Sequence, residues 1–183
     1  MSTRFETCLT GFVWRPENDG QPPHTDPGDT GGLTSWGMTY STFSEWRSIK
    51  KLPYINIPDF NKLNRVAFYD CYKDLFWNKV CGDLLPIGLD LLVFDFAVLS
   101  GGKHAVEELQ KCLGGIGVDG DAGTETQTAI KDRASRVSFD VYHSAQMAYF
   151  RNCSTWNLFH NGWTRRSNDA LSQAKLDAKT VVK

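Results

Sequence analysis

The most informative segment of the sequence is Asp29-Thr30-Gly31-Gly32-Leu33-Thr34-Ser35-Trp36-Gly37-Met38-Thr39. It closes a segment, residues 17–37, that is too dense in Gly, Pro, Asp, Asn and Thr to form a regular helix. Loops longer than about 12–15 residues inside compact domains are usually functional or disordered, and the aromatic residues at the end of this one favour function. Because glycine permits the positive φ angles of tight turns, we predict a short β-hairpin around residues 31–39.

Helical patterns flank this loop on both sides. Apolar residues at helical spacing predict a first helix over residues 3–14, which Pro16 stops. Ser41 or Thr42 is expected to cap the next helix, and Asn61 the one after it. The remaining helices are predicted over residues 43–51, 62–79, 87–100, 103–113, 124–150 and 165–180, with a turn at residues 161–163. The fold class is therefore mainly α.

Composition excludes several kinds of protein. The chain has 183 residues, 41% hydrophobic and 22% charged, which suits a globular domain. A net charge of −1 provides no global basic field for nucleic acid. Residues 131–183 hold 9 Lys and Arg against 4 Asp and Glu, so this part either faces an anionic polymer or is a solvated helix face. Five cysteines without a CxxC pair, and histidines without ligand spacing, argue against a disulfide framework and a metal site.

The most apolar stretch, residues 84–99, predicts a buried helix. It is too short to span a bilayer and contains Asp90 and Asp95. A buried aspartate must be hydrogen-bonded or paired, so we expect a structural role for Asp95, for example in tying the two halves of the chain together. The N-terminus lacks an apolar signal segment. We therefore expect the protein to be made in a cytoplasm, and if its substrate lies outside the cell another factor must release it.

Glu17 lies at the mouth of the loop, directly after the first helix. A glycosidase needs one carboxylic acid that protonates the leaving oxygen, and a second polar group that handles water or charge on the other face. Apolar packing by Trp14 would help to keep Glu17 protonated, and a hairpin could return Asp29 and Thr34 to face it. An Asp in a glycine-rich turn is more often a turn residue than a catalyst, so the residues alone leave both possibilities open.

The whole pattern resembles the N-acetylmuramidase family of glycoside hydrolases found in phage endolysins. The shared motif is a Glu at a helix end followed by D-x-G-G-x-T-x-x-G-[IM]-T, here Glu17 and residues 29–39. Other segments resemble the helical, peptidoglycan-associated half of that family, namely residues 94–101, 105–110, 118–126 and the G-W-x-x-R pattern within residues 159–166. The resemblance implies a lysozyme-like helical domain with a long N-terminal active-site loop. Residues 1–85 would form the catalytic half and residues 86–183 the peptidoglycan-associated half, packed as one globular unit.

The resemblance also implies an activity. The protein would be an endolysin that hydrolyses the β-1,4 bond between N-acetylmuramic acid and N-acetylglucosamine in bacterial peptidoglycan. Glu17 would be the general acid, Asp29 would hold a water or offset oxocarbenium charge, and Thr34 would orient that water. No cofactor is implied. The protein is expected to act as a monomer that stays in the host bacterial cytoplasm until a separate holin releases it to the periplasm or cell wall.

Four residues are candidates for substrate contact. Trp36 and Tyr40 flank the loop, where their rings could either stack on sugars or pack in the core. Gly31 and Gly32 would let the backbone approach a bulky sugar closely.

Three alternatives remain open from the sequence. Glu17 is followed by Asn18-Asp19-Gly20 where the family has E-G-G, which motivates a non-catalytic peptidoglycan-binding module. The same fold could instead cleave chitin, or act as a lytic transglycosylase that uses the same acid. Product analysis distinguishes all of them.

Overall fold

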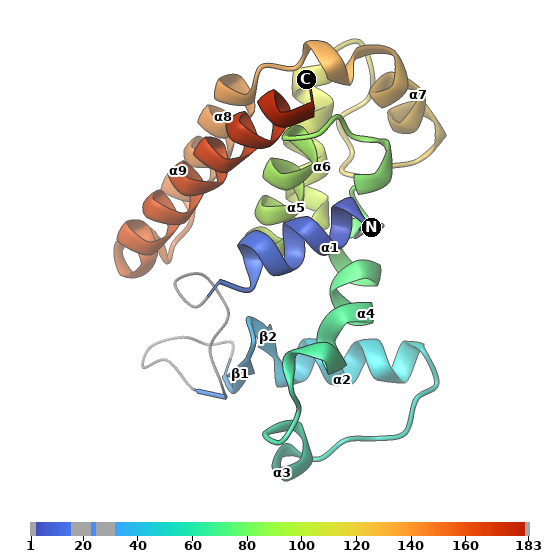
Figure 1. The fold of residues 1–183 in the computed structure, drawn as a ribbon, viewed down its shortest axis with the longest axis vertical. Helices are drawn as coiled ribbons and strands as arrows, with labels where there is room; N and C mark the ends of the chain where they lie inside the picture. The colour runs from blue at the N-terminus through green and yellow to red at the C-terminus, as the bar shows by residue number, and fades with distance from the viewer. Residues whose placement is uncertain (1–2, 16–22, 25–31, 182–183) are drawn as a thin grey trace. The chain divides into compact units, whose positions relative to one another are not determined.

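The computed structural model describes residues 3–15, 23–24 and 32–181 of the chain (Figure 1). The chain divides into two compact units, unit 1 over Met1–Leu75 and unit 2 over Phe76–Lys183. The described part is mainly α with one small antiparallel sheet, which confirms the predicted fold class. The division of roles between residues 1–85 and 86–183 stays a prediction.

Unit 1 contains most of the short elements. They are α1 (Arg4–Cys8), η1 (Leu9–Val13), β1 (Thr34–Ser35), β2 (Met38–Thr39), α2 (Tyr40–Ile49), α3 (Ile57–Phe60), η2 (Arg65–Phe68), α4 (Tyr69–Tyr72) and the start of η3 (Lys73–Trp77). The predicted first helix and the predicted hairpin are both present. The second half of that first helix, η1, is a π-helical turn. Such turns are rare and occur often at functional sites.

Two predicted helix caps and one predicted helix in unit 1 are wrong. Thr39, rather than Ser41 or Thr42, caps α2, because its Oγ1 accepts the backbone N–H of Thr42 at 3.2 Å. The helix predicted over residues 62–79 is broken into 3₁₀, α and π segments, and Asn64 rather than Asn61 caps the first of them. The break turns Phe68 fully inward and leaves Val66 70% exposed, so packing overrides the helical pattern there.

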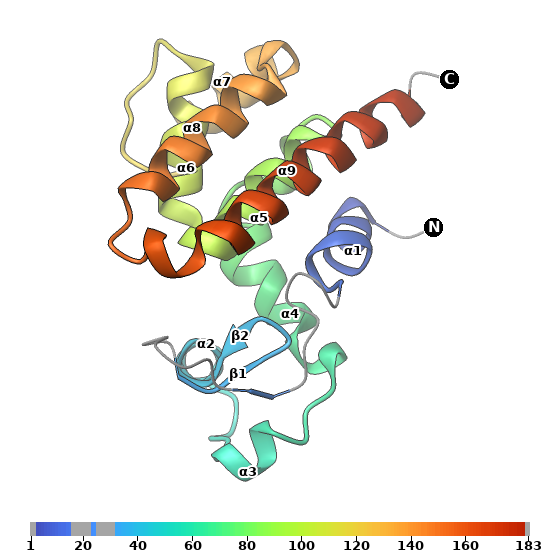
Figure 2. The same ribbon diagram turned by 90° about the vertical axis from the view of Figure 1, so that its left-hand side faces the viewer.

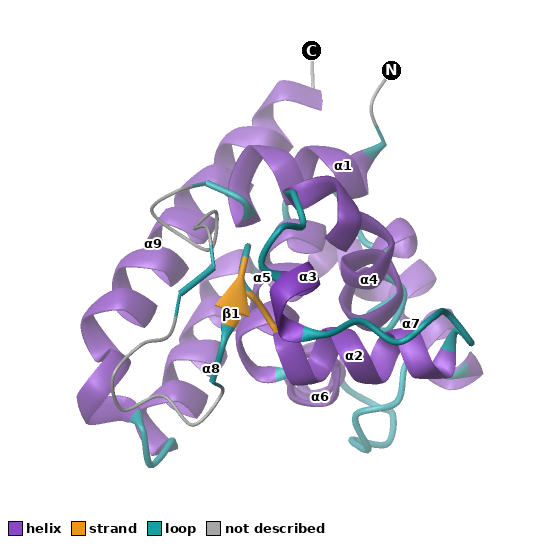
Figure 3. Cartoon of the chain, turned by 90° about the horizontal axis from the view of Figure 1, so that it is seen from below, coloured by secondary structure: helices purple, strands orange, loops and turns teal. Residues whose placement is uncertain are grey.

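Aromatic rings form the core of unit 1. Phe43 from α2 packs against Phe68 with ring centroids 4.8 Å apart and against Phe60 at 5.8 Å. Phe60 and Phe68 are themselves 5.6 Å apart. All three side chains are fully buried, so this cluster fixes α2, α3 and η2 around one centre. The hairpin is joined to it because β2 runs directly into α2 (Figure 3).

Unit 2 is a helical assembly around one apolar helix. Its elements are η4 (Gly82–Leu84), α5 (Leu89–Ser100), α6 (Gly102–Leu113), α7 (Thr124–Arg133), η5 (Ala134–Arg136), α8 (Phe139–Asn152) and α9 (Trp156–Val181). Every residue of α5 from Leu89 to Ala97 is buried, and the helix packs against α6, α8 and α9 (Figure 2). This confirms the predicted buried helix. Within the described ranges, no helix combines the length and apolarity needed to cross a bilayer.

The C-terminal helix is longer than predicted. Residues 161–163 lie inside α9 instead of forming a turn. Trp163 stacks on Phe150 of α8 with ring centroids 4.9 Å apart, and it also contacts Trp156 and Phe159 of its own helix. These contacts offset the roughly 1 kcal/mol that Gly162 costs a helix relative to alanine.

Asp95 forms a buried ion pair inside unit 2. Its side chain is fully buried in α5, and the Nε of Arg166 in α9 donates to its Oδ1 at 2.9 Å. Arg166 is 4% exposed. Asp95 therefore has the expected structural role. It pairs with a residue of the same unit and connects α5 to α9.

Candidate active site

The hairpin carries the described part of the motif in residues 29–39. Thr34 pairs with Thr39 and Ser35 with Met38. His24 adds a bridge on the other side of β1, because its backbone N–H and C=O each bond to Thr34 at 2.9 Å. Thr34 therefore sits between two neighbouring backbone segments, which holds its side chain in a defined place.

A tight turn closes the hairpin. Trp36 has φ +52° and Gly37 has φ +75°, the pair of positive values that defines a type I′ turn. This conformation favours Asn, Asp or Gly, and a tryptophan there carries a steric cost of about 1–2 kcal/mol. Strained residues persist where the surrounding structure holds them and cluster at functional sites. The half-buried Trp36 is thus a candidate for substrate contact on structural as well as sequence grounds.

Tyr72 links this turn to the end of the first helix. Its hydroxyl donates to the carbonyl oxygen of Trp36 at 2.8 Å. Its ring meets the ring of Trp14 edge-on, with centroids 5.7 Å apart. Trp14 is only 4% exposed, and it is the third residue before Glu17 in the sequence. Tyr72 was not predicted as a site residue, because nothing local in the sequence marks a contact 36 residues away.

Thr34 and Gly32 are both half-buried residues of the motif. The Thr34 hydroxyl donates to the Gly32 carbonyl oxygen at 3.3 Å, so its own oxygen keeps lone pairs that can accept a hydrogen bond from water. Gly32 has φ +73°, and a Cβ built there would meet no atom of the described residues within 4 Å. The backbone at Gly32 therefore has the space that a close approach by a sugar requires.

Tyr40 has a structural contact that uses its hydroxyl. Its Oη donates to the carbonyl oxygen of Ile55 at 2.8 Å, and its ring packs edge-on against Phe60 at 5.4 Å. The ring is half-buried in unit 1. The predicted sugar contact of Tyr40 stays a prediction, and only the exposed part of the ring is available for it.

Three predicted site residues, Glu17, Asp29 and Gly31, lie outside the described residues. Among the carboxylates that are described in unit 1, Asp74 has the most connected position. Burial alone would raise its pKa, but hydrogen bonds from Lys50 at 2.8 Å and from the indole N–H of Trp46 at 2.9 Å lower it overall. Asp74 is therefore ionised and unsuited to donate a proton.

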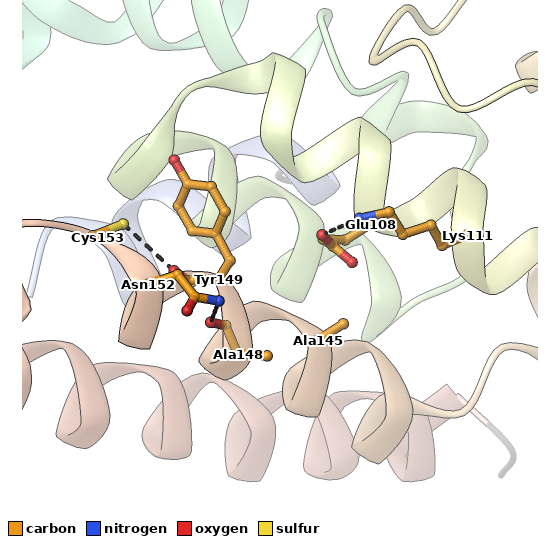
Figure 4. A pocket seen from close by; sticks show the side chains of 7 residues that line it. All are labelled: Glu108, Lys111, Ala145, Ala148, Tyr149, Asn152 and Cys153. Atoms are coloured by element: carbon orange, nitrogen blue, oxygen red, sulfur yellow. Dashed lines mark hydrogen bonds and ion pairs between the residues drawn. The ribbon is translucent and has the colours of Figure 1, made fainter.

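Unit 2 contains a separate groove between α6 and α8, with a volume of about 570 Å³. Figure 4 shows its lining, which consists of Glu108, Lys111, Ala145, Ala148, Tyr149, Asn152 and Cys153. Its one carboxylate, Glu108, lies 2.7 Å from the ammonium group of Lys111. A groove with a single, paired carboxylate lacks the two carboxyl groups that glycoside hydrolysis uses. Elsewhere in the described ranges, no three His, Cys, Asp or Glu side chains gather closely enough to hold a metal ion.

Comparisons with known proteins agree with the motif. The family model described as glycosyl hydrolase 108 matches residues 18–101, a range that starts one residue after Glu17. The solved structure of Brucella abortus SagA matches with a TM-score of 0.80 and 31% sequence identity, and the match covers 95% of each chain. No curated protein matches the chain. The resemblance seen in residues 29–39 is thereby confirmed, and this lysozyme-like helical chain belongs to the glycosyl hydrolase 108 family of glycoside hydrolases.

Proposed function

We propose that this glycoside hydrolase cleaves bacterial peptidoglycan at the β-1,4 bond between N-acetylmuramic acid and N-acetylglucosamine, with Glu17 as the general acid. The observation that carries the proposal is the hairpin. Residues 32–39 hold the second half of the family motif, and they form a strained turn that Tyr72 and His24 fix in place. Strained turns cluster at functional sites, so this turn supports a role of residues 32–39 in substrate binding and catalysis.

The proposed reaction is a hydrolysis. Glu17 gives its proton to the glycosidic oxygen as the bond from that oxygen to C1 of the muramic acid breaks. Positive charge develops on the sugar ring, and Asp29 offsets it or holds the incoming water. The water adds its hydroxyl group to C1, and its second proton restores a carboxylic acid. Both products then carry hydroxyl groups at the cleaved positions.

Thr34 contributes to positioning the water in this scheme. Its hydroxyl proton is directed to Gly32, so the oxygen faces any other partner as an acceptor. A water that donates one hydrogen to Thr34 keeps a lone pair free to attack C1. The pairing of β1 with both β2 and His24 supports this role, because it restricts the movement of Thr34.

The proposal is tested with purified sacculi and three proteins. Wild type, Glu17→Gln and Glu45→Gln are incubated with the sacculi, and the soluble products are identified by mass spectrometry. Glu45 is an exposed residue of α2, so it provides the same chemical change away from the hairpin motif. We expect fragments with reducing N-acetylmuramic acid ends from wild type and Glu45→Gln, and none from Glu17→Gln, since glutamine has no acidic proton to donate.

Other outcomes identify the alternatives. Anhydro-muramic ends would mean a lytic transglycosylase, and equal turnover of chitin oligomers would mean a broader glycosidase. Full activity in a folded Glu17→Gln protein would refute the role of Glu17. Binding of the wild-type protein to sacculi without any product would leave a peptidoglycan-binding module.

We also propose that the enzyme acts as a monomer and reaches the wall after release from the host cytoplasm. Expression in a Gram-negative host should leave cells intact until a membrane-permeabilising agent is added, and lysis should follow at once. Lysis without the agent would refute the need for a separate release factor.

A further inference from the structure

One aromatic side chain of unit 1 is exposed and yet held in place. Tyr54 lies in the connector between α2 and α3 and is 83% exposed. Its hydroxyl oxygen is 3.1 Å from the hydroxyl oxygen of Tyr40. Because Tyr40 gives its own proton to the carbonyl oxygen of Ile55, Tyr54 is the donor in this tyrosine pair. The hydrogen bond fixes the outer end of the Tyr54 ring.

The backbone on both sides of Tyr54 is also fixed. The carbonyl oxygen of Pro53 accepts two hydrogen bonds from the guanidinium group of Arg47, at 3.0 and 2.8 Å. The carbonyl oxygen of Ile55 accepts the Tyr40 hydroxyl at 2.8 Å. Side chains of α2 therefore hold the residue before Tyr54, the residue after it and the end of its ring. Figure 1 shows this connector returning along α2 towards α3.

Exposure alone would carry no meaning, because single apolar side chains are common on protein surfaces. An exposed side chain that is also held in place is less common. Holding it costs rotamer entropy, and its hydroxyl group could hydrogen-bond to water instead. A ring that is fixed before binding presents a flat apolar face, and its ligand then binds without a further entropic cost for that side chain. Such rings are well suited to the apolar faces of sugars.

The same tyrosine pair is connected to the hairpin. The backbone N–H of Tyr40 donates to the carbonyl oxygen of Leu33 at 2.8 Å, directly beside Thr34. Tyr40 thus bonds with its backbone to the catalytic motif and with its side chain to the connector. We propose that Tyr54 is a stacking platform that extends the glycan-binding site beyond the bond that is cleaved, with Tyr40 and Arg47 as positioning residues. The inference rests on the proposed function, because it takes the ligand to be the glycan strand.

A platform of this kind makes binding depend on substrate length. A strand long enough to reach Tyr54 gains the stacking contact, whereas a short one does not. The contact is present before and during the reaction, so its loss raises KM and leaves kcat unchanged. We expect Tyr54→Ala to raise KM for long strands by about two- to ten-fold, the range given by aromatic contacts of moderate strength. KM for short strands should not change.

The experiment uses the full chain and peptide-free peptidoglycan strands of two defined lengths, one short and one long. Kinetics are measured for wild type, Tyr54→Ala, Tyr54→Phe, Tyr40→Phe and the control Val66→Ala. Val66 is 70% exposed in the same unit and lies outside the connector. Tyr54→Phe keeps the ring but loses the hydrogen bond to Tyr40, so it should raise KM for long strands less than Tyr54→Ala does. Tyr40→Phe removes the hydroxyl that holds Ile55 and Tyr54, and it should raise KM for long strands less than Tyr54→Ala does.

The inference is overturned if Tyr54→Ala matches wild type on long strands, or if its KM rises equally for both lengths. If the wild-type protein does not cleave the strands, calorimetric binding of the long strand separates the two proposals. Weaker binding by Tyr54→Ala would then support the platform while the proposed function fails. Equal binding by both proteins, or binding by neither, would overturn the platform as well.

Discussion

The turn at Trp36 allows a test that separates backbone strain from side-chain contacts. Trp36 has a left-handed backbone conformation with φ +52°. Substitution by alanine or by glycine removes the same half-buried indole, so the difference between the two variants reports on the backbone alone. Alanine keeps the left-handed cost of about 1–2 kcal/mol. Glycine avoids that cost but loses about 0.5–1 kcal/mol more chain entropy on folding.

The expected result is that Trp36→Gly is more stable than Trp36→Ala by about 0.5–1 kcal/mol. Urea unfolding followed by circular dichroism measures the two free energies of unfolding. Glu45→Ala and Glu45→Gly provide a control with the opposite expected order. Glu45 is exposed in the middle of α2, so Glu45→Ala should be more stable than Glu45→Gly by about 1 kcal/mol. If Trp36→Ala is as stable as Trp36→Gly, the left-handed backbone at position 36 does not carry the expected steric cost, and the prediction is refuted.

The same two variants test the role of the indole in activity. If Trp36 contacts the glycan, both variants should lose activity to the same extent although their stabilities differ. Unequal losses that follow stability would instead show that the tryptophan matters only through folding.

Three further predictions concern stability. Arg166→Met should lower the free energy of unfolding by about 3–5 kcal/mol because it leaves buried Asp95 without this partner, and adding Asp95→Leu should recover much of the loss, as thermal unfolding would show. Gly82→Ala should strongly destabilise the protein, because the new Cβ would clash with the ring of Trp77; a melting temperature equal to wild type would contradict this contact. The pKa of Asp74 is lower in the folded protein than its ordinary value of about 4 in the unfolded chain, so ionised Asp74 stabilises the fold at pH values above about 4. This contribution is lost as the pH falls through the folded pKa. The difference in free energy of unfolding between wild type and Asp74→Asn should therefore become smaller in acid.

Local signals predicted the parts of the fold that local chemistry determines. The hairpin follows from the glycines of the motif, and α5 follows from its apolar run between Pro86 and Gly101. Features that depend on distant partners were not predictable. Thr39 caps α2 because the hairpin places it there, and α9 continues through Gly162 because Trp163 stacks on Phe150 from another helix.

The same distinction applies to the candidate site. Thr34, Trp36 and Tyr40 were predicted because they belong to or flank a recognisable motif. Tyr54 and Tyr72 were missed, because one lies in a proline-bounded connector and the other in a segment that looked like ordinary helix. Their importance arises from hydrogen bonds to residues 14 and 36 positions away, which no periodic pattern encodes.

The bridge between His24 and Thr34 has a consequence for how this region could change in evolution. It attaches His24 to β1, so the sequence before His24 and the sequence after it each run between two fixed points of the described structure. An insertion or deletion on one side leaves the attachment points of the other side unchanged, and the energetic effect of added length grows only slowly. Homologous enzymes could therefore vary the two sides independently, and a protein engineer could lengthen one of them while the hairpin keeps its register.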